Sequence, residues 1–168
     1  MTRKENTGYI ITGALIAAAY AGLTYLSNMF SLAYGPIQLR LSEVLTILPV
    51  FTPAAIPGLT IGCFISNIGS FNVADLIFGT LATLVAAVLT RALKDNLIKG
   101  IPVFALIPPV IINALVIGFE IAVFYLDNTS FLWGFLISAL EVGLGQTIVC
   151  FVFGIPFYMV VKKYKIFK

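Results

Sequence analysis

The sequence has no histidine and few charged residues, and these two shortages exclude several classes of protein. Histidine is the most common general base and the most common metal ligand, so its absence argues against many active sites. Only 10% of the 168 residues are charged, whereas 60% are hydrophobic and the mean hydropathy is +1.06. A soluble domain has about 25% charged residues. Because water would not tolerate so much apolar surface, the composition predicts an integral membrane protein.

Cysteine is also scarce, and no catalytic or nucleotide-binding motif is present. Cys63 and Cys150 both lie in apolar stretches, so we interpret them as small core residues rather than as a disulfide or a metal site. The sequence contains no nucleophile–base pair and no Gly-rich phosphate loop ending in Lys-Ser or Lys-Thr. The acidic residues are scattered over separate helices, which argues against a metal ion. We therefore expect no enzyme, no metal, no cofactor and no nucleic-acid partner.

Six apolar stretches predict six membrane-spanning helices in a single domain that covers residues 1–168. The stretches run over about 9–27, 42–56, 57–69, 73–93, 101–126 and 131–161. The first, fourth, fifth and sixth are long enough to cross a bilayer about 30 Å thick. The second and third are short and are joined through Pro49, Pro53 and Pro57, so one long kinked helix is the alternative. In either case the sequence predicts an all-α membrane bundle.

The positions of Lys and Arg favour six spans over five. These residues cluster at 3–4, 91–99 and 162–168, and six spans with an internal N-terminus put all three clusters on the cytoplasmic side. Five spans would put the 91–99 cluster outside. We therefore expect a multi-pass protein of the cell membrane with both termini in the cytoplasm and a long external loop over 28–41.

The first span carries small side chains that suit close contact with another helix. They repeat at a spacing of four in two adjacent rows, which are Ala14, Ala18 and Gly22, and Gly13, Ala17 and Ala21. Rows of this kind let two membrane helices approach closely. Two interpretations stay open: the rows pack inside the bundle, or they dock a separate membrane protein.

Four acidic residues lie within the predicted spans, where a charge is costly and indicates function. The six-span map places them all in the outer half of the membrane, and they are Glu43, Asp75, Glu120 and Glu141. For Asp75 we favour an acid at a helix N-terminus, stabilised by the helix dipole. For Glu120 and Glu141 we favour a cavity open to the outside over a structural hydrogen bond.

Polar residues lie close to these acids on the last two spans. Asn113 comes seven residues before Glu120 and therefore shares its helix face. Gln146 lies below Glu141 on an adjacent face. Trp133 suits an aromatic residue at the membrane interface, and stacking on a planar ligand is the alternative.

The external loop has the pattern of a lid. Apolar and polar residues alternate over 37–42, which predicts an extended segment with one apolar and one polar face. Ser42 is the expected N-cap of the second span, and Glu43 would lie in its first turn. We expect Arg40 to pair with Glu43 or with a deeper acid. The candidate ligand-binding residues are thus Glu141, Glu120, Asn113, Glu43, Arg40, Gln38, Trp133 and Gln146.

These side chains favour a ligand that is rich in hydrogen-bond donors and carries positive charge. A carboxylate accepts two parallel N–H groups, as from a guanine-like edge. Our hypothesis assigns the donor edge and the cation to Glu141 and Glu120, in either order, and the closing of the lid to Glu43, Gln38 and Arg40.

The loop also resembles the signature of a known family. Residues 34–43 read Tyr-Gly-Pro-Ile-Gln-Leu-Arg-Leu-Ser-Glu, and residues 45–49 read Leu-Thr-Ile-Leu-Pro. This segment is similar to that of the QueT family, the substrate-binding S components of energy-coupling-factor (ECF) uptake transporters. The resemblance implies a six-helix S-component fold that captures a queuosine precursor, 7-aminomethyl-7-deazaguanine or a near relative, from outside. It further implies docking through Ala14, Ala17, Ala18, Ala21 and Gly22 onto a membrane T component with two ATPases.

Three alternatives remain open at this point. The chain is an S component for another vitamin-like solute, a small intramembrane enzyme acting on lipid-linked substrates, or a structural membrane protein without a ligand. The loop pattern argues against the first, the absence of histidine against the second, and the four acids against the third.

Overall fold

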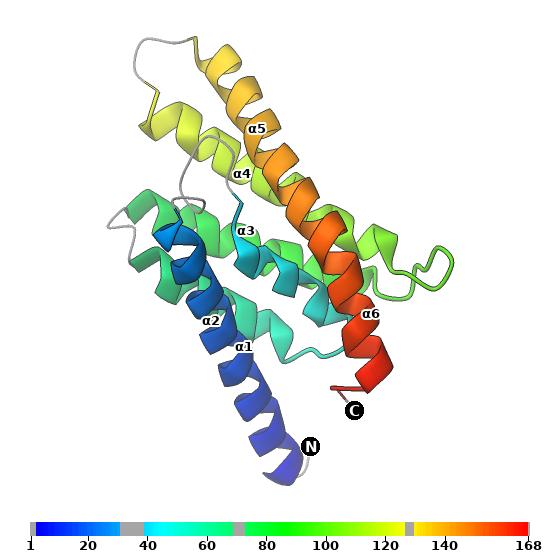
Figure 1. Ribbon diagram of the computed structural model, residues 1–168. Helices are drawn as coiled ribbons and strands as arrows, with labels where there is room; N and C mark the ends of the chain where they lie inside the picture. Colours follow the sequence, from blue (N-terminus) through cyan, green and yellow to red (C-terminus); the bar gives the residue numbers. More distant parts are fainter. Residues whose placement is uncertain (1–2, 31–38, 69–72, 127–129, 168) are drawn as a thin grey trace.

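The computed structural model describes residues 3–30, 39–68, 73–126 and 130–167, and it confirms an all-helical bundle in these ranges (Figure 1). The elements are α1 (Arg3–Met29), η1 (Leu41–Val50), α2 (Ala55–Ile68), α3 (Val73–Ala92), η2 (Val103–Leu106), α4 (Ile107–Phe124), α5 (Phe131–Thr147), η3 (Ile148–Phe153) and α6 (Gly154–Tyr164). Each of the six apolar stretches contains a helix.

Four helical segments of the described chain are long and apolar enough to cross a membrane. They are Arg3–Met29, Val73–Ala92, Val103–Phe124 and Phe131–Tyr164. The other two, Leu41–Val50 and Ala55–Ile68, are shorter. Four of the six expected spans therefore have the length for a complete crossing, and η1 and α2 lie between them.

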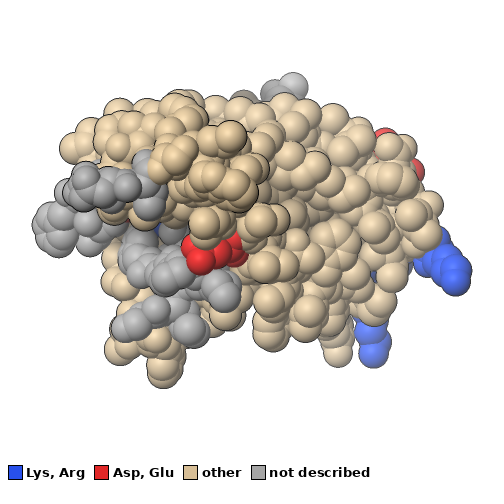
Figure 2. Space-filling model, turned by 90° about the horizontal axis from the view of Figure 1, so that it is seen from above, with Lys and Arg blue, Asp and Glu red and all other residues tan. Residues whose placement is uncertain are grey.

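The charged side chains divide the bundle into two ends. Both chain termini lie at the same end in Figure 1, where α1 begins and α3 and α6 finish. We call this the basic end, and we call the opposite end, where α3 begins and α4 finishes, the acidic end. Figure 2 shows Lys and Arg side chains gathered at one end of the molecule, with some acidic side chains near them, and a separate patch of acidic side chains away from that end.

Helix α1 packs against α2 at small residues, where the backbones of the two helices lie close together. A Cβ atom added at Gly58 would lie 2.7 Å from the carbonyl oxygen of Gly13, and one at Gly62 would lie 2.8 Å from that of Ala17. Larger side chains at Gly58 and Gly62 would therefore push the helices apart. The row that contains Ala17 and Ala21 is buried in this contact. The other row, Ala14, Ala18 and Gly22, is exposed.

The second predicted span differs from the expectation of a helix over 42–56. The structure has a 3-10 helix of ten residues instead, followed by a break before α2 begins at Ala55. This break also excludes a single long kinked helix. At about 2 Å per residue, a 3-10 helix of this length extends about 20 Å, less than the apolar thickness of a bilayer. It is an internal element, packed against α1, α3, η3 and α6.

Hydrogen bonds at both ends hold η1 in place. Its N-cap is Arg40 rather than Ser42, because the helix already begins at Leu41. Ser42 instead accepts a hydrogen bond from the hydroxyl of Thr24, with an O–O distance of 2.7 Å. At the other end, Nη1 of Arg91 donates to the carbonyl oxygens of Pro49 and Val50 at 2.9 and 3.2 Å. A guanidinium at this position satisfies carbonyls that the end of a helix leaves open.

The last predicted span contains a π-helical turn, η3, between α5 and α6. Pro156 has no backbone N–H and cannot bond the carbonyl of Val152, four residues earlier. The π turn accommodates this break while the helical path continues. It begins two residues after Gln146 and includes Cys150, whose sulfur contacts the amide of Gln146, so it lies next to the polar interior of the bundle.

Candidate functional site

The carboxylate of Glu43 forms the centre of a polar site inside the bundle. Glu43 is the third residue of η1 and is only 3% exposed. The hydroxyl of Tyr20 donates to Oε1, and Oε2 accepts hydrogen bonds from Nε2 of Gln146 at 2.8 Å and Nδ2 of Asn113 at 3.5 Å. Donors from α1, α4 and α5 thus converge on a single carboxylate. A buried carboxylate requires such partners, because desolvation without them costs several kcal/mol.

The position of Glu43 is deeper than the sequence suggested. Its partner Asn113 precedes the end of α4 at Phe124 by eleven residues, or about 16 Å at 1.5 Å per residue. Sequence reasoning put Glu43 near the outer start of a span, as part of a lid. In the structure it lies in the middle of the bundle, because η1 begins within the bundle.

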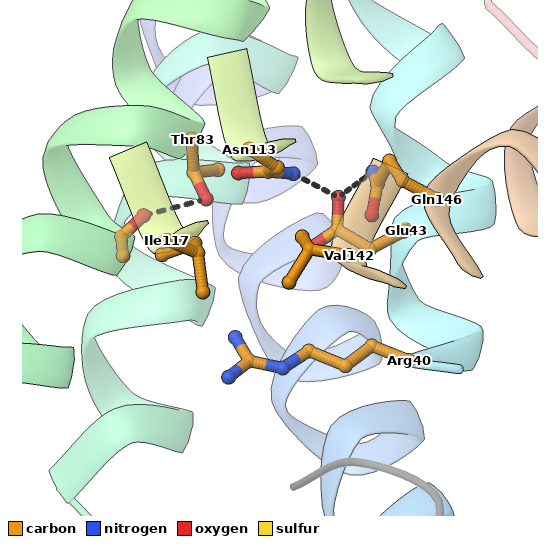
Figure 3. Close-up of a pocket in the computed structure, with 8 residues that line it drawn as sticks. Arg40, Glu43, Thr83, Asn113, Ile117, Val142 and Gln146 are labelled. Carbon is orange, nitrogen blue, oxygen red and sulfur yellow. Dashed lines mark hydrogen bonds between the residues drawn. The ribbon is translucent and has the colours of Figure 1, made fainter. Parts of the chain in front are cut away.

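A small cavity adjoins this carboxylate. Its volume is about 10 Å³, and its lining is Arg40, Glu43, Gly79, Thr83, Asn113, Ile117, Val142 and Gln146. A volume of this size holds about one water molecule. In Figure 3 the amides of Asn113 and Gln146 point at Glu43, and the side chain of Arg40 extends across the pocket toward Ile117. The site therefore combines an acceptor, two amides and a guanidinium around a closed space.

A sulfur atom and a hydroxyl support the site from the basic end. Sγ of Cys150 lies 3.6 Å from Nε2 of Gln146 and 3.8 Å from Oγ1 of Thr46. The same hydroxyl of Thr46 donates to the backbone carbonyl of Glu43 at 2.6 Å. Cys150 and Thr46 thus fix the amide of Gln146 and the backbone that carries Glu43.

The structure brings together four of the eight predicted ligand-binding residues, Glu43, Arg40, Asn113 and Gln146. Glu141 is half-buried on α5 and does not line the cavity, and Trp133 is 66% exposed on the bundle surface. Gln38 lies outside the described residues. Most of the predicted lid, 31–38, lies outside them too.

Glu120 belongs to a second polar group, nearer the acidic end. Its side chain is completely buried in α4, close enough to Asp75 of α3 for the two carboxyl groups to interact. The hydroxyl of Tyr125 lies 3.4 Å from Oδ1 of Asp75, and Nδ2 of Asn67 donates to the backbone carbonyl of Asp75 at 2.9 Å. Asp75 lies in the first turn of α3, as the sequence predicted.

Sequence reasoning missed Tyr20, although it makes direct contact with the central carboxylate. A signal was present: Tyr20 lies deep within the first apolar stretch, whereas tyrosine in membrane helices is enriched at the interfaces. It also missed Gly79, Thr83, Ile117 and Val142, which line the cavity without carrying a charge. A small or apolar lining residue has no sequence pattern that separates it from the rest of the core.

The polar groups of the site are suited to binding a polar ligand. Among the described residues there is no group of three or more His, Cys, Asp or Glu side chains that would hold a metal ion. A carboxylate surrounded by amides, a phenol and a guanidinium offers both acceptors and donors to a polar ligand. Most of the remaining lining is apolar, as in typical small-molecule sites.

Comparison with known proteins assigns the family. A family model described as QueT transporter matches residues 10–163, which is most of the chain. The chain belongs to the QueT transporter family. Membership confirms the similarity that residues 34–49 indicated, and it places the chain among transporters rather than enzymes.

A curated relative of this QueT-family chain points the same way. The queuosine precursor transporter QueT of Lactococcus lactis subsp. cremoris (strain MG1363) is 45% identical over 94 residues. The match covers 56% of this chain and 56% of the relative, so it spans about half of the length of each. No solved structure matches this chain.

Proposed function

We propose that the chain is the substrate-capture (S) component of an ECF-type uptake transporter and that its solute is a queuosine precursor. The substrate class follows the name of the Lactococcus lactis relative, and the S-component role follows the family resemblance of residues 34–49. On this proposal the basic end faces the cytoplasm, in keeping with the excess of Lys and Arg at cytoplasmic ends.

The observation that carries the proposal is the Glu43 site in the interior of the bundle. A 7-deazaguanine ring presents a row of N–H donors along one edge, and a fixed carboxylate is the matching acceptor. The amides of Asn113 and Gln146 already contact Glu43 and can turn toward the carbonyl and ring nitrogen of a bound base. The pocket therefore has the polar groups that a guanine-like ring requires.

Binding requires the pocket to widen. A cavity of about 10 Å³ holds a water molecule but not a bicyclic ring, so the pocket has to enlarge before such a solute can enter. Arg40 is 8% exposed and lies across the cavity, just before the helix that carries Glu43. We propose that Arg40 moves to admit the solute, which is the lid role predicted for this residue.

The first experiment is a binding measurement on the purified full-length protein. We expect 7-aminomethyl-7-deazaguanine to bind at one site per chain in calorimetry and thiamine not to bind. Replacing Glu43 by Gln keeps the shape of the side chain but removes its charge, and it should weaken binding by about 100-fold, since hydrogen bonds to charged groups contribute about 1.5–3 kcal/mol each. Asp95→Asn, at an exposed position at the basic end, is the matched control.

The outcomes of this experiment separate the candidates. Binding of the deazaguanine that survives in Asp95→Asn and is lost in Glu43→Gln supports the proposal. If calorimetry detects binding of thiamine but of no deazaguanine, the transporter role stands and the assignment of a queuosine precursor as the solute is wrong.

The proposed partner complex is tested through α1. Ala14, Ala18 and Gly22 form an exposed row of small residues, and small residues let a partner helix approach closely. We expect Ala18→Trp to abolish co-purification with the T component and its ATPases while leaving solute binding unchanged. Ala19→Trp changes an equally small, exposed residue about 100° around the same helix and should leave co-purification intact. Equal effects of the two variants would contradict docking through this row.

A further inference from the structure

Among the described residues, no group forms a hydrogen bond with the buried carboxyl group of Glu120. Its side chain is 0% exposed, and neither Oε1 nor Oε2 has a hydrogen-bond partner among the described residues. An unpaired ionised group in such a position is strongly unfavourable unless a positive charge neutralises it. Most buried polar atoms in proteins are paired, so this exception requires a reason.

The neighbour of Glu120 is a second carboxyl group. Phe78 of α3 packs between Phe119 and Phe124 of α4, with ring centroids 6.3 and 6.0 Å apart. This contact sets the start of α3 beside the end of α4 and places Asp75, one turn from Phe78, next to Glu120. Two ionised carboxylates have no donor hydrogen to share, so the pair attracts either a proton or a cation.

The overall charge of the interior favours a cation. Among the described residues, the cavity and this pair together contain three carboxyl groups, Glu43, Asp75 and Glu120, and one guanidinium, that of Arg40. When all three carboxyl groups are ionised, one monovalent cation brings this balance of charges closer to neutral. No group of three acidic, Cys or His ligands surrounds the pair within the described ranges, so an organic cation suits it better than a metal ion.

The pair also lies in line with the pocket. On α4, Asn113, Ile117 and Glu120 share a face, and the first two line the cavity. On α3, Asp75, Gly79 and Thr83 repeat at a spacing of four, and the last two line the cavity. Seven residues separate Asn113 from Glu120, which corresponds to about 10 Å along the helix. The length suits a fused bicyclic ring with a one-carbon arm.

We propose that Asp75 and Glu120 form a subsite for a protonated primary amine on the solute, while Glu43 accepts the donor edge of its ring. This inference rests on the proposed function. It assigns the cation to the acidic end and the ring to the middle of the bundle. It also explains why Glu120 has no hydrogen-bond partner among the described residues: its partner is part of the ligand.

A pair of probes tests the subsite. The compounds are 7-aminomethyl-7-deazaguanine, whose alkylamine is protonated at neutral pH, and 7-cyano-7-deazaguanine, which has the same ring and no charge. Calorimetry with both compounds is performed on the wild-type chain, Glu120→Gln, Asp75→Asn, Glu43→Gln and the control Asp95→Asn. We expect Glu120→Gln and Asp75→Asn to weaken the binding of the aminomethyl compound by about 10- to 100-fold. Binding of the cyano compound should not change, which also shows that the variants are folded.

The other results distinguish this inference from the proposed function. Glu43→Gln should weaken the binding of both compounds to a similar extent, because Glu43 is proposed to contact the ring that both compounds contain. Suppose that the wild type binds both compounds and that Glu120→Gln weakens the binding of both equally, or of neither. The proposed subsite is then wrong, and the proposed function stands. If the wild type binds neither compound, the proposed function is wrong and the subsite falls with it.

Discussion

Glu43 and Glu120 are both buried in the same bundle, yet their surroundings are opposite. Glu43 accepts hydrogen bonds from side chains of three helices, whereas Glu120 has no hydrogen-bond partner among the described residues. Neutral donors stabilise Glu43 and hold its carboxylate in one orientation. Glu120 faces another acid. The difference separates a carboxylate that the fold itself satisfies from one for which we propose a partner on the solute.

This contrast implies that the two acids affect stability with opposite signs. A group with three partners holds the fold together, and its removal leaves those partners unsatisfied. A buried charged group without a partner lowers stability, and its replacement by an apolar side chain of similar volume is neutral or favourable. Substituting Met at both positions tests the contrast with the same chemical change.

The largest effect is expected for Glu43→Met. The change leaves the hydroxyl of Tyr20 and the amides of Asn113 and Gln146 without their acceptor in the interior. Each unsatisfied group costs about 1–3 kcal/mol, so the free energy of unfolding should fall by about 4 kcal/mol. A denaturant titration of the ligand-free protein in mixed micelles measures this value. In Glu43→Gln, which retains an acceptor oxygen, the loss should be about 1 kcal/mol. Equal losses in the two variants would show that the hydrogen bonds are not responsible.

Glu120→Met should have a smaller effect in the opposite direction. Removing a buried carboxyl group that lacks hydrogen bonds is expected to raise the free energy of unfolding of the empty protein by about 2 kcal/mol. The same titration measures it, and the gain should accompany the loss of affinity for the aminomethyl compound. A loss of stability comparable to that of Glu43→Met would contradict the comparison, because it would mean that the fold already satisfies Glu120.

The sequence predicted the individual polar residues better than their grouping. Glu43, Asn113, Gln146 and Arg40 stand out because polar side chains are rare in apolar stretches. Helical spacing shows which residues share a face, such as Asn113 and Glu120, but it does not show which face of one helix meets another. For this reason sequence reasoning assigned the ligand to Glu141 rather than to Glu43. The depth of Glu43 in the bundle depends on where η1 begins, which the sequence does not show.

The sequence also did not predict that η1 is a 3-10 helix or where it ends. Seven of its ten residues are apolar, the exceptions being Ser42, Glu43 and Thr46 near its start, and these apolar positions have no clear period. An α-helix and a 3-10 helix therefore fit them equally well. The bonds of Arg91 to the carbonyls of Pro49 and Val50 come from a residue 41 or more positions away. The small-residue rows of α1, by contrast, were predicted as close-contact faces, and the structure places one of them against Gly58 and Gly62.

The smallest expected effect is that of Tyr20→Phe, which removes one of the three donors to Glu43 and leaves the ring in place. Tyr20 is 0% exposed, so water cannot replace its hydroxyl. We expect the free energy of unfolding to fall by about 1 kcal/mol and the affinity for both deazaguanines to fall together, because the hydroxyl orients the carboxylate that binds the shared ring. Tyr25→Phe is the matched control on the same helix, since its hydroxyl donates to the carbonyl of Ile65 from an exposed position. If Tyr20→Phe lowered the affinity for the aminomethyl compound alone, the amine would have to lie at Glu43. That result would contradict the assignment of the ring to Glu43 and of the amine to Glu120.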